Sequence, residues 1–277
     1  MNRLRAEIER FADGGLAGSE ADARAAFAEL KAALNAGTVR AAERGDDGVW
    51  RANAWVKAGI LLGFRLGRLR QMAGAPMPYF DKDTWPLRTI TTGDGIRLVP
   101  GGSSIRDGCY VAPGVVCMPP MYINAGAYVD EGTLIDSHAL VGSCAQIGRR
   151  VHLSAGAQIG GVLEPVGQLP VVLEDDVFIG GNCGIYEGTV VRERAVLAAG
   201  TILTGGSVVI DLVHDRTYRR EGDVALEIPA GAVVVPGSRP VRTGPGAAAG
   251  IALYTPVIVK YRDERTDASA TLEELLR

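Results

Sequence analysis

Residues 123–159, INAGAYVDEGTLIDSHALVGSCAQIGRRVHLSAGAQI, carry an aliphatic side chain at every sixth position. The same interval continues on both sides, as Val99, Ile105, Val111, Cys117, Ile123, Val129, Ile135, Val141, Ile147, Leu153 and Ile159, then Leu173, Ile179, Ile185, Val191, Leu197, Leu203 and Val209, and last Ile228 and Val234. An α-helix repeats its buried face about every 3.6 residues, so it does not explain an interval of six. Short β-branched segments at this spacing are typical of hexapeptide β-helix repeats.

Two further columns accompany the aliphatic series. Glycine dominates the position three residues after each aliphatic side chain, as at Gly126 and Gly132, and Asn182 takes that position once. Both residue types tolerate a positive φ, so this column predicts corners in the left-handed backbone conformation. A small residue such as Ala127 or Ala145 comes two positions before the next aliphatic one, so both side chains point to one face of a short strand. Three such strands and three corners make a coil of about 18 residues, which predicts a mainly β chain folded as a parallel β-helix.

The N-terminal third of the chain has a different pattern. Residues 1–95 precede the regular series, and apolar residues occur at helical spacing in Ala21–Leu34 and Val49–Leu69. We therefore expect an N-terminal α-helical domain at residues 1–95. Such a domain caps the first coil, whose apolar side chains and strand edge would otherwise be exposed.

The β-helix itself is predicted for residues 96–242. The six-residue interval breaks twice, so we expect loop insertions near 162–171 and 211–227. Insertions into repeat proteins map to loops on one face, often the binding face. Residues 243–277 are expected to add a C-terminal strand and a short helix, at Leu253–Tyr261 and Thr271–Leu276.

The composition argues against several classes of partner. A net charge of −3 and a pI of about 5.7 give no basic field that would attract nucleic acid. The first residues, MNRLRAEIERFADGG, are charged and contain no apolar signal core. The apolar stretch at Gly59–Phe64 is far shorter than the roughly 20 residues of a membrane span. We expect a cytoplasmic protein that binds neither nucleic acid nor a membrane.

The cysteines and histidines show no metal pattern. The cysteines are at positions 109, 117, 144 and 183, and the histidines at positions 138, 152 and 214. The cysteines form no C-x-x-C pair, and the repeat places Cys109 and Cys183 in small inward positions, so we expect buried free thiols. The histidines lie 14 and 62 residues apart, whereas γ-class carbonic anhydrases, which share this kind of fold, bind zinc through closely spaced histidines. The sequence therefore predicts no metal site.

The interior of a β-helix is filled with side chains, so chemistry has to use outward residues, corners, loops and clefts between copies. The segments GAYVDEGTLID and VGSCAQIG are much more specific than a generic hexapeptide repeat, and EDDVFIGG, YEGTVV, WRANAWVKAGILLGFRL and PVIVK extend the pattern over almost the whole chain. Together they resemble the tetrahydrodipicolinate N-succinyltransferases of the lysine/diaminopimelate pathway. The resemblance implies a left-handed β-helix, a homotrimer, and binding of succinyl-CoA between neighbouring subunits.

The resemblance also implies roles for three residues. Asp136 and Glu187 match two carboxylates that surround the amine of the amino-dicarboxylate acceptor, and Arg106 matches an arginine that binds an acceptor carboxylate. The chemistry fits these residue types, because an ammonium must lose a proton before it attacks a thioester. An acyl-CoA, succinyl-CoA or acetyl-CoA, is then the co-substrate. Ser238 and Lys260, near the C-terminal coils, are candidates for CoA contacts.

Two segments depart from the family pattern. The family has a tryptophan where this chain has His138, and it has A-R-S-E where this chain reads Gly181–Gly184. His138, Asn182 and Cys183 are therefore candidates for substrate binding. Loss of a cation that pairs with a carboxylate removes a charge-assisted hydrogen bond of roughly 1.5–3 kcal/mol, so these replacements bear on the acceptor and on the acyl group.

Three functions remain open at this point. The first is a CoA-dependent N-acyltransferase acting on tetrahydrodipicolinate, 2-amino-6-oxopimelate or a close analogue. The second is an acetyl-CoA-using relative of the kind that acts in tabtoxin biosynthesis, which the replaced segments favour. The third is an acyl-CoA-binding trimer without turnover. A purely structural solenoid does not explain the two long insertions.

Overall fold

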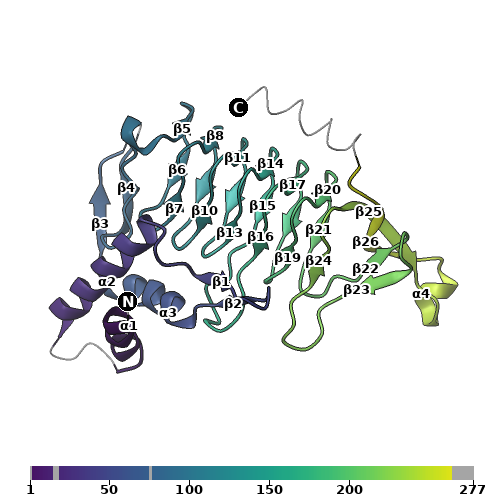
Figure 1. Cartoon of the computed structure of the whole chain (residues 1–277), viewed down its shortest axis with the longest axis horizontal. Coiled ribbons are helices and arrows are strands. Elements are labelled where there is room, and N and C mark those ends of the chain that lie inside the picture. Colours follow the sequence, from purple (N-terminus) through teal and green to yellow (C-terminus); the bar gives the residue numbers. More distant parts are fainter. Residues whose placement is uncertain (1, 15–18, 75–76, 264–277) are drawn as a thin grey trace.

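The computed structural model describes residues 2–14, 19–74 and 77–263. The N-terminal helices gather at one end of a long prism, and an antiparallel ribbon with one short helix closes the other end (Figure 1). The N-terminal part contains α1 (Asn2–Gly14), α2 (Glu20–Asn35), the hairpin of β1 (Ala42–Arg44) and β2 (Trp50–Ala52), α3 (Ala54–Leu66), and the hairpin of β3 (Leu69–Met72) and β4 (Tyr79–Lys82). A short 3₁₀ turn, η1 (Thr92–Asp94), leads into the prism.

The three helices pack closely because α3 offers small residues to its neighbours. A Cβ on Gly59 would lie 2.3 Å from Leu30 of α2, and one on Gly63 would lie 2.2 Å from Phe27. The helical core also buries Trp85, which is 1% exposed. The expected helix at Val49–Leu69 is shorter in the structure, since its first residues form β2 instead.

The prism consists of short parallel strands in three sheets. The β7 sheet contains β7 (Tyr110–Val111), β10 (Tyr128–Val129), β13 (Gln146–Ile147), β16 (Val172–Leu173), β19 (Val190–Val191) and β24 (Glu227–Ile228). The β8 sheet contains β5 (Arg97–Leu98), β8 (Val116–Cys117), β11 (Leu134–Ile135), β14 (His152–Leu153), β17 (Phe178–Ile179) and β20 (Val196–Leu197). The β9 sheet contains β6 (Ser104–Ile105), β9 (Tyr122–Ile123), β12 (Leu140–Val141), β15 (Gln158–Ile159), β18 (Gly184–Ile185) and β21 (Ile202–Leu203).

The register confirms the predicted coil. Val129 pairs in parallel with Ile147, 18 residues later, and both side chains are fully buried. The corners also take the predicted conformation, because glycines such as Gly126 and non-glycines such as His138 and Asn182 have positive φ. The fold class, a left-handed parallel β-helix with a helical N-terminal region, is confirmed.

The three edges of the prism are named here by the sheets that meet there. Edge A joins the β8 and β9 sheets, edge B joins the β9 and β7 sheets, and edge C joins the β7 and β8 sheets. The first insertion leaves from edge B, and Ile159 therefore pairs with Ile185, 26 residues later instead of 18. The loop formed by this insertion lies against the N-terminal helices. There the buried Lys57 of α3 donates hydrogen bonds to the carbonyls of Pro165 and Gln168, at 3.0 and 2.6 Å.

Two positions of the six-residue series do not take the expected coil register. Leu98, and not Val99, pairs with Cys117, because an extra residue at the Gly101–Gly102 turn shifts the first strand by one. Val209 is expected to pair with Val191. It is buried, but Ile228 pairs with Val191 in its place. The strand that begins at Val209, β22 (Val209–Asp211), instead pairs with β23 (Arg216–Tyr218) and with β26 (Ala252–Tyr261).

The C-terminal segment closes the last coil. In β25 (Ala232–Pro240) Val234 pairs with Leu197 of β20, and β25 then runs antiparallel to β26. A short helix, α4 (Gly244–Ala248), connects the two strands. The strand expected at Leu253–Tyr261 corresponds to β26, and the helix expected at Thr271–Leu276 lies outside the described residues.

Candidate functional site

Edge A carries three candidate residues whose side chains point outward, Asp136, His138 and Asn182. Asp136 follows β11, with its backbone N–H bonded to Leu153 O at 2.9 Å and its Oδ1 accepting from Ser137 N at 2.7 Å. His138, at φ 62°, exposes its side chain at the same corner. Asn182 is exposed two coils further along, at φ 55°. These polar groups therefore point outward from edge A.

A glycine between them lets Asn182 lean along the edge. The Asn182 Oδ1 lies 2.5 Å from the Cβ that Gly156 would carry, so any other residue at position 156 would displace it. Gly156 N donates to Ser137 O at 2.9 Å, and Asn182 N donates to Ala155 O at 3.0 Å. Backbone hydrogen bonds thus stack three successive corners of edge A at the coil spacing.

Cys183, the neighbour of Asn182, faces the opposite way. Its side chain is 0% exposed, and its thiol is 3.1 Å from Ala198 O inside the prism. Burial raises the pKa of the Cys183 thiol, so it stays protonated. The prediction that Cys183 binds substrate is therefore wrong for this structure, because the inward repeat position removes the thiol from the surface.

Arg106 lies on edge B and already has a carboxylate partner. Its guanidinium pairs with Asp81 of β4, donates to Asn124 Oδ1 at 3.4 Å and lies 5.4 Å from the ring centre of Phe64. The side chain is 16% exposed. An acceptor carboxylate at Arg106 would therefore have to compete with Asp81.

Glu187 lies on the same edge but at the other end of the prism. Its backbone has φ 55°, its side chain is exposed, and its Oε2 accepts a hydrogen bond from Gly205 N at 2.8 Å. Glu187 lines a groove of about 730 Å³. The groove is bounded by the β1–β2 hairpin (residues 49–52), the first insertion (165–169) and the second insertion (220–227).

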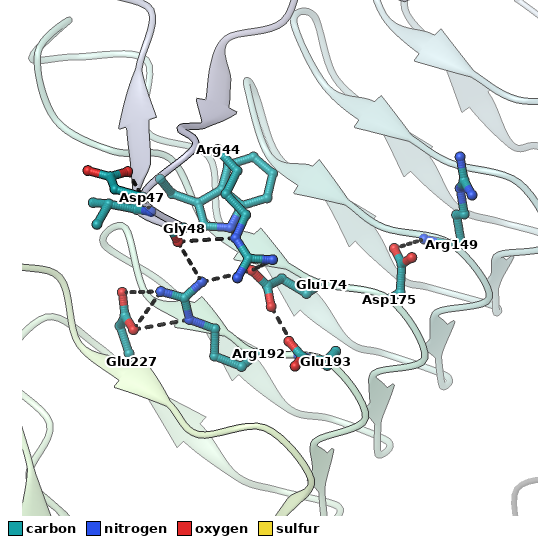
Figure 2. A network of polar contacts seen from close by, with 11 residues as sticks. Arg44, Asp47, Gly48, Arg149, Glu174, Asp175, Arg192, Glu193 and Glu227 are labelled. Atoms are coloured by element: carbon teal, nitrogen blue, oxygen red, sulfur yellow. Dashed lines mark hydrogen bonds and ion pairs between the residues drawn. The ribbon is translucent and has the colours of Figure 1, made fainter.

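A polar network fixes two walls of this groove (Figure 2). Arg192 donates to both carboxylate oxygens of Glu227 at 2.8 Å, to Glu174 Oε1 at 2.9 Å and to Gly48 O at 3.2 Å. Trp50 Nε1 also donates to Glu174 Oε1, at 2.8 Å. Glu174 is only 6% exposed, so these donors replace the water that its charge would otherwise need.

The network also contains a pair of carboxyl groups. A side-chain hydrogen bond with Glu174 raises the pKa of Glu193. Burial of Glu174 opposes its ionisation, but hydrogen bonds from Glu193, Trp50 and Arg192 outweigh burial and lower the pKa of Glu174. Trp50 also lines a second cavity, of about 490 Å³, so this one side chain borders two hollows of the surface.

The two candidates for CoA contacts lie apart on the terminal ribbon. Ser238 pairs with Tyr254 across the ribbon, whereas Lys260 pairs with Val233 and its Nζ lies 3.4 Å from Asp263. Ser238 and Val233, the partner of Lys260, are five positions apart along extended β25. This spacing separates the two candidates by roughly 17 Å. One small group cannot contact both side chains in this arrangement.

Within one chain, the candidate residues Asp136, Glu187 and Arg106 lie far apart. Asp136 is on edge A and Glu187 on edge B, two coils further along. Arg106 shares edge B with Glu187 but is four coils away, on the order of 19 Å at the usual strand spacing. The sequence indicates Glu187 and the two insertions of this groove, but it does not indicate the wall formed by the β1–β2 hairpin.

Neither a metal cluster nor a membrane span occurs in the described part of the chain. Among residues 2–14, 19–74 and 77–263, no three His, Cys, Asp or Glu side chains gather in a way that could hold a metal ion. Within the same ranges, every helix is too short or too polar to cross a membrane.

Comparison with known proteins identifies the family. A model of the N-terminal part of tetrahydrodipicolinate N-succinyltransferase matches residues 4–66, and a model of the hexapeptide repeat of succinyl-transferase matches residues 170–205. A curated protein of Aromatoleum aromaticum is 46% identical over 92% of this chain and 89% of its own length, and one of Azoarcus sp. is 45% identical over 94% and 92%. A third, of Polynucleobacter asymbioticus, is 43% identical over 93% and 90%. All three are named 2,3,4,5-tetrahydropyridine-2,6-dicarboxylate N-succinyltransferase. This chain therefore belongs to the tetrahydrodipicolinate N-succinyltransferases, a family of hexapeptide-repeat acyltransferases.

Proposed function

We propose that this chain transfers a succinyl group from succinyl-CoA to the amine of 2-amino-6-oxopimelate, the open form of tetrahydropyridine-2,6-dicarboxylate. The observation that carries the proposal is the exposed Glu187 carboxylate, held by Gly205 N at 2.8 Å in a groove of about 730 Å³. The names of the relatives supply the substrate class.

The reaction needs a base and a way to hold two substrates. A carboxylate within hydrogen-bond reach takes a proton from the acceptor ammonium, and the freed amine attacks the carbonyl carbon of the thioester. The new N–C bond forms as the C–S bond breaks, and the nitrogen loses a second proton, which protonates the departing CoA thiolate to the thiol. We assign the contact with the amine to Asp136 and Glu187. Holding the acceptor beside the thioester supplies much of the remaining acceleration.

The two carboxylates belong, in this proposal, to different copies of the chain. Edge A of one prism lies beside edge B of the next in a homotrimer, so that Asp136 of one copy faces the Glu187 groove of its neighbour. The separation of the two residues within one chain supports this arrangement, because neither edge alone offers both carboxylates. Succinyl-CoA then lies along the cleft between the two prisms.

Release of free thiol by the purified protein tests the proposal. With L-2-aminopimelate as a stable acceptor, we expect thiol release from succinyl-CoA that depends on the acceptor and is slower with acetyl-CoA. A preference for acetyl-CoA would instead support an enzyme of the tabtoxin type, which the altered Gly181–Gly184 segment favours. No release with either donor, together with measurable binding of acyl-CoA, would support a trimer without turnover.

A further inference from the structure

The second insertion brings an arginine to the carboxylate of Glu187. Gly205 N donates to Glu187 Oε2 at 2.8 Å. A Cβ built on Gly205 would lie 2.9 Å from Glu187 Oε2 and 3.6 Å from Arg220 Nη1. The two charged groups thus flank one small space, yet they are more than 4.0 Å apart and form no ion pair with each other.

Arg220 keeps most of its hydrogen-bonding capacity. Its Nε donates to Gly222 O at 3.0 Å, and none of the described carboxylates lies within 4.0 Å of its guanidinium nitrogens. The side chain is exposed in the groove that Glu187 lines. The donors on Nη1 and Nη2 therefore remain for a ligand, in the fork geometry that suits a carboxylate.

The other arginines near the candidate site are already engaged. Arg51, which also lines the groove, pairs with Asp47, and its Nη1 is 2.8 Å from Asp47 Oδ1. Arg106 pairs with Asp81 at the far end of edge B. Arg220 is therefore the guanidinium of the described groove that has no carboxylate partner.

We propose that Arg220 binds the carboxylate that adjoins the acceptor amine, while Glu187 contacts the amine itself; this inference rests on the proposed function. An α-amino acid carries its ammonium and carboxylate on one carbon, so it requires an anion and a cation side by side but not bonded to each other. Glu187 and Arg220 meet that requirement around Gly205.

Steady-state kinetics of three variants tests this role. Arg220→Gln is expected to raise the KM for L-2-aminopimelate about 10- to 100-fold, the loss of a charge-assisted hydrogen bond, and to leave the KM for succinyl-CoA unchanged. Arg220→Lys keeps the charge and is expected to recover part of the affinity. Arg219→Gln is the matched control, because Arg219 is exposed, pairs loosely with Glu221 at 3.8 Å and does not line the groove.

A second acceptor shows which group Arg220 recognises. 6-Aminohexanoate lacks the carboxylate beside the amine, so its KM is expected to be high and equal in the wild type and in Arg220→Gln. An equal rise for both acceptors, a rise in the KM for succinyl-CoA, or no change at all would overturn the assignment. If the wild type shows no turnover, the proposed function fails separately, and calorimetric binding of L-2-aminopimelate decides the role of Arg220 by its loss or retention in Arg220→Gln.

Discussion

Asp136 and Glu187 lie on different edges of one prism, separated by two coils. Both are outward residues that follow fully buried isoleucines, Ile135 and Ile185. The buried positions of the repeat therefore determine where each carboxylate can point. Together with the groove around Glu187, this geometry is the basis of the proposed site shared by two copies of the chain, and of the following predictions.

Asp136→Asn is expected to lower kcat by about 10²- to 10⁴-fold, since an amide cannot take the proton of the ammonium. Asp130→Asn is the control, because Asp130 has the same local structure on edge C. Its N–H is bonded to Ile147 O at 3.0 Å, and its Oδ1 accepts from Glu131 N at 2.9 Å. Initial rates of thiol release compare the two variants. Similar rates for Asp136→Asn and the wild type would remove Asp136 from the mechanism.

Arg192→Met is expected to lower the free energy of unfolding by about 3 kcal/mol, because it leaves the buried Glu174 without its closest cation. It also releases Glu227 and the hairpin carbonyl of Gly48, so activity should fall as well. Arg149→Met is the control, since Arg149 is 52% exposed and its ion pairs are worth at most about 1 kcal/mol. Urea unfolding at one protein concentration measures both, and equal losses would contradict the assigned role of Arg192.

The Glu174–Glu193 pair predicts a pH effect on stability. The hydrogen bond with Glu174 raises the pKa of Glu193 in the fold above its ordinary value of 4.5. The stability that protonated Glu193 contributes is therefore fully present at a pH below that ordinary pKa. This stability is lost as the pH rises through the raised pKa. Glu193→Gln keeps a neutral side chain at this position at every pH, whereas the wild type loses its neutral form as the pH rises. The free energy of unfolding of the variant, minus that of the wild type, should therefore increase between pH 4 and pH 8. Urea midpoints across this range check the trend, and a difference independent of pH would refute it.

All four cysteines are expected to resist a thiol reagent in the native protein. Each is buried and free, and burial raises the pKa of Cys109, Cys117 and Cys144 to about 12. At pH 8 the thiolate fraction of such a group is on the order of 10⁻⁴. Ellman's reagent should therefore titrate no thiol before denaturation and four afterwards. Rapid labelling of Cys183 in the native protein would show that its thiol is accessible, and Cys183 would again be a candidate for substrate binding.

Much of the β-helix could be predicted because its information is local and periodic. Each coil repeats the same inward positions, so the six-residue interval alone assigns Ile135 and Ile185 to the core, where both are fully buried. One register error comes from the extra residue at the Gly101–Gly102 turn, and the other occurs where a distant strand competes for pairing. Val209 fits the six-residue interval, but β26 pairs with its strand and draws it out of the coil.

The groove could not be predicted in the same way. Trp50 is apolar and at helical spacing, but its indole N–H bonds to Glu174, 124 positions later, and β2 forms there instead. Arg220 has no repeat position, and only the folded insertion brings it to Gly205. Lys57 looks out of place on an apolar helix, a signal that could have pointed to the loop carbonyls it binds. Contacts of this kind depend on the tertiary arrangement and leave no periodic trace.

Subunit complementation tests the shared site most directly. Asp136→Asn and Glu187→Gln are each expected to be nearly inactive as homotrimers. After the two are unfolded together and reassembled at equal amounts, random mixing in a trimer should restore about one quarter of the wild-type sites, because one copy supplies Asp136 and its neighbour supplies Glu187. Recovered thiol release near that level is the predicted result. A mixture that stays as inactive as its two components would contradict a site built from two chains.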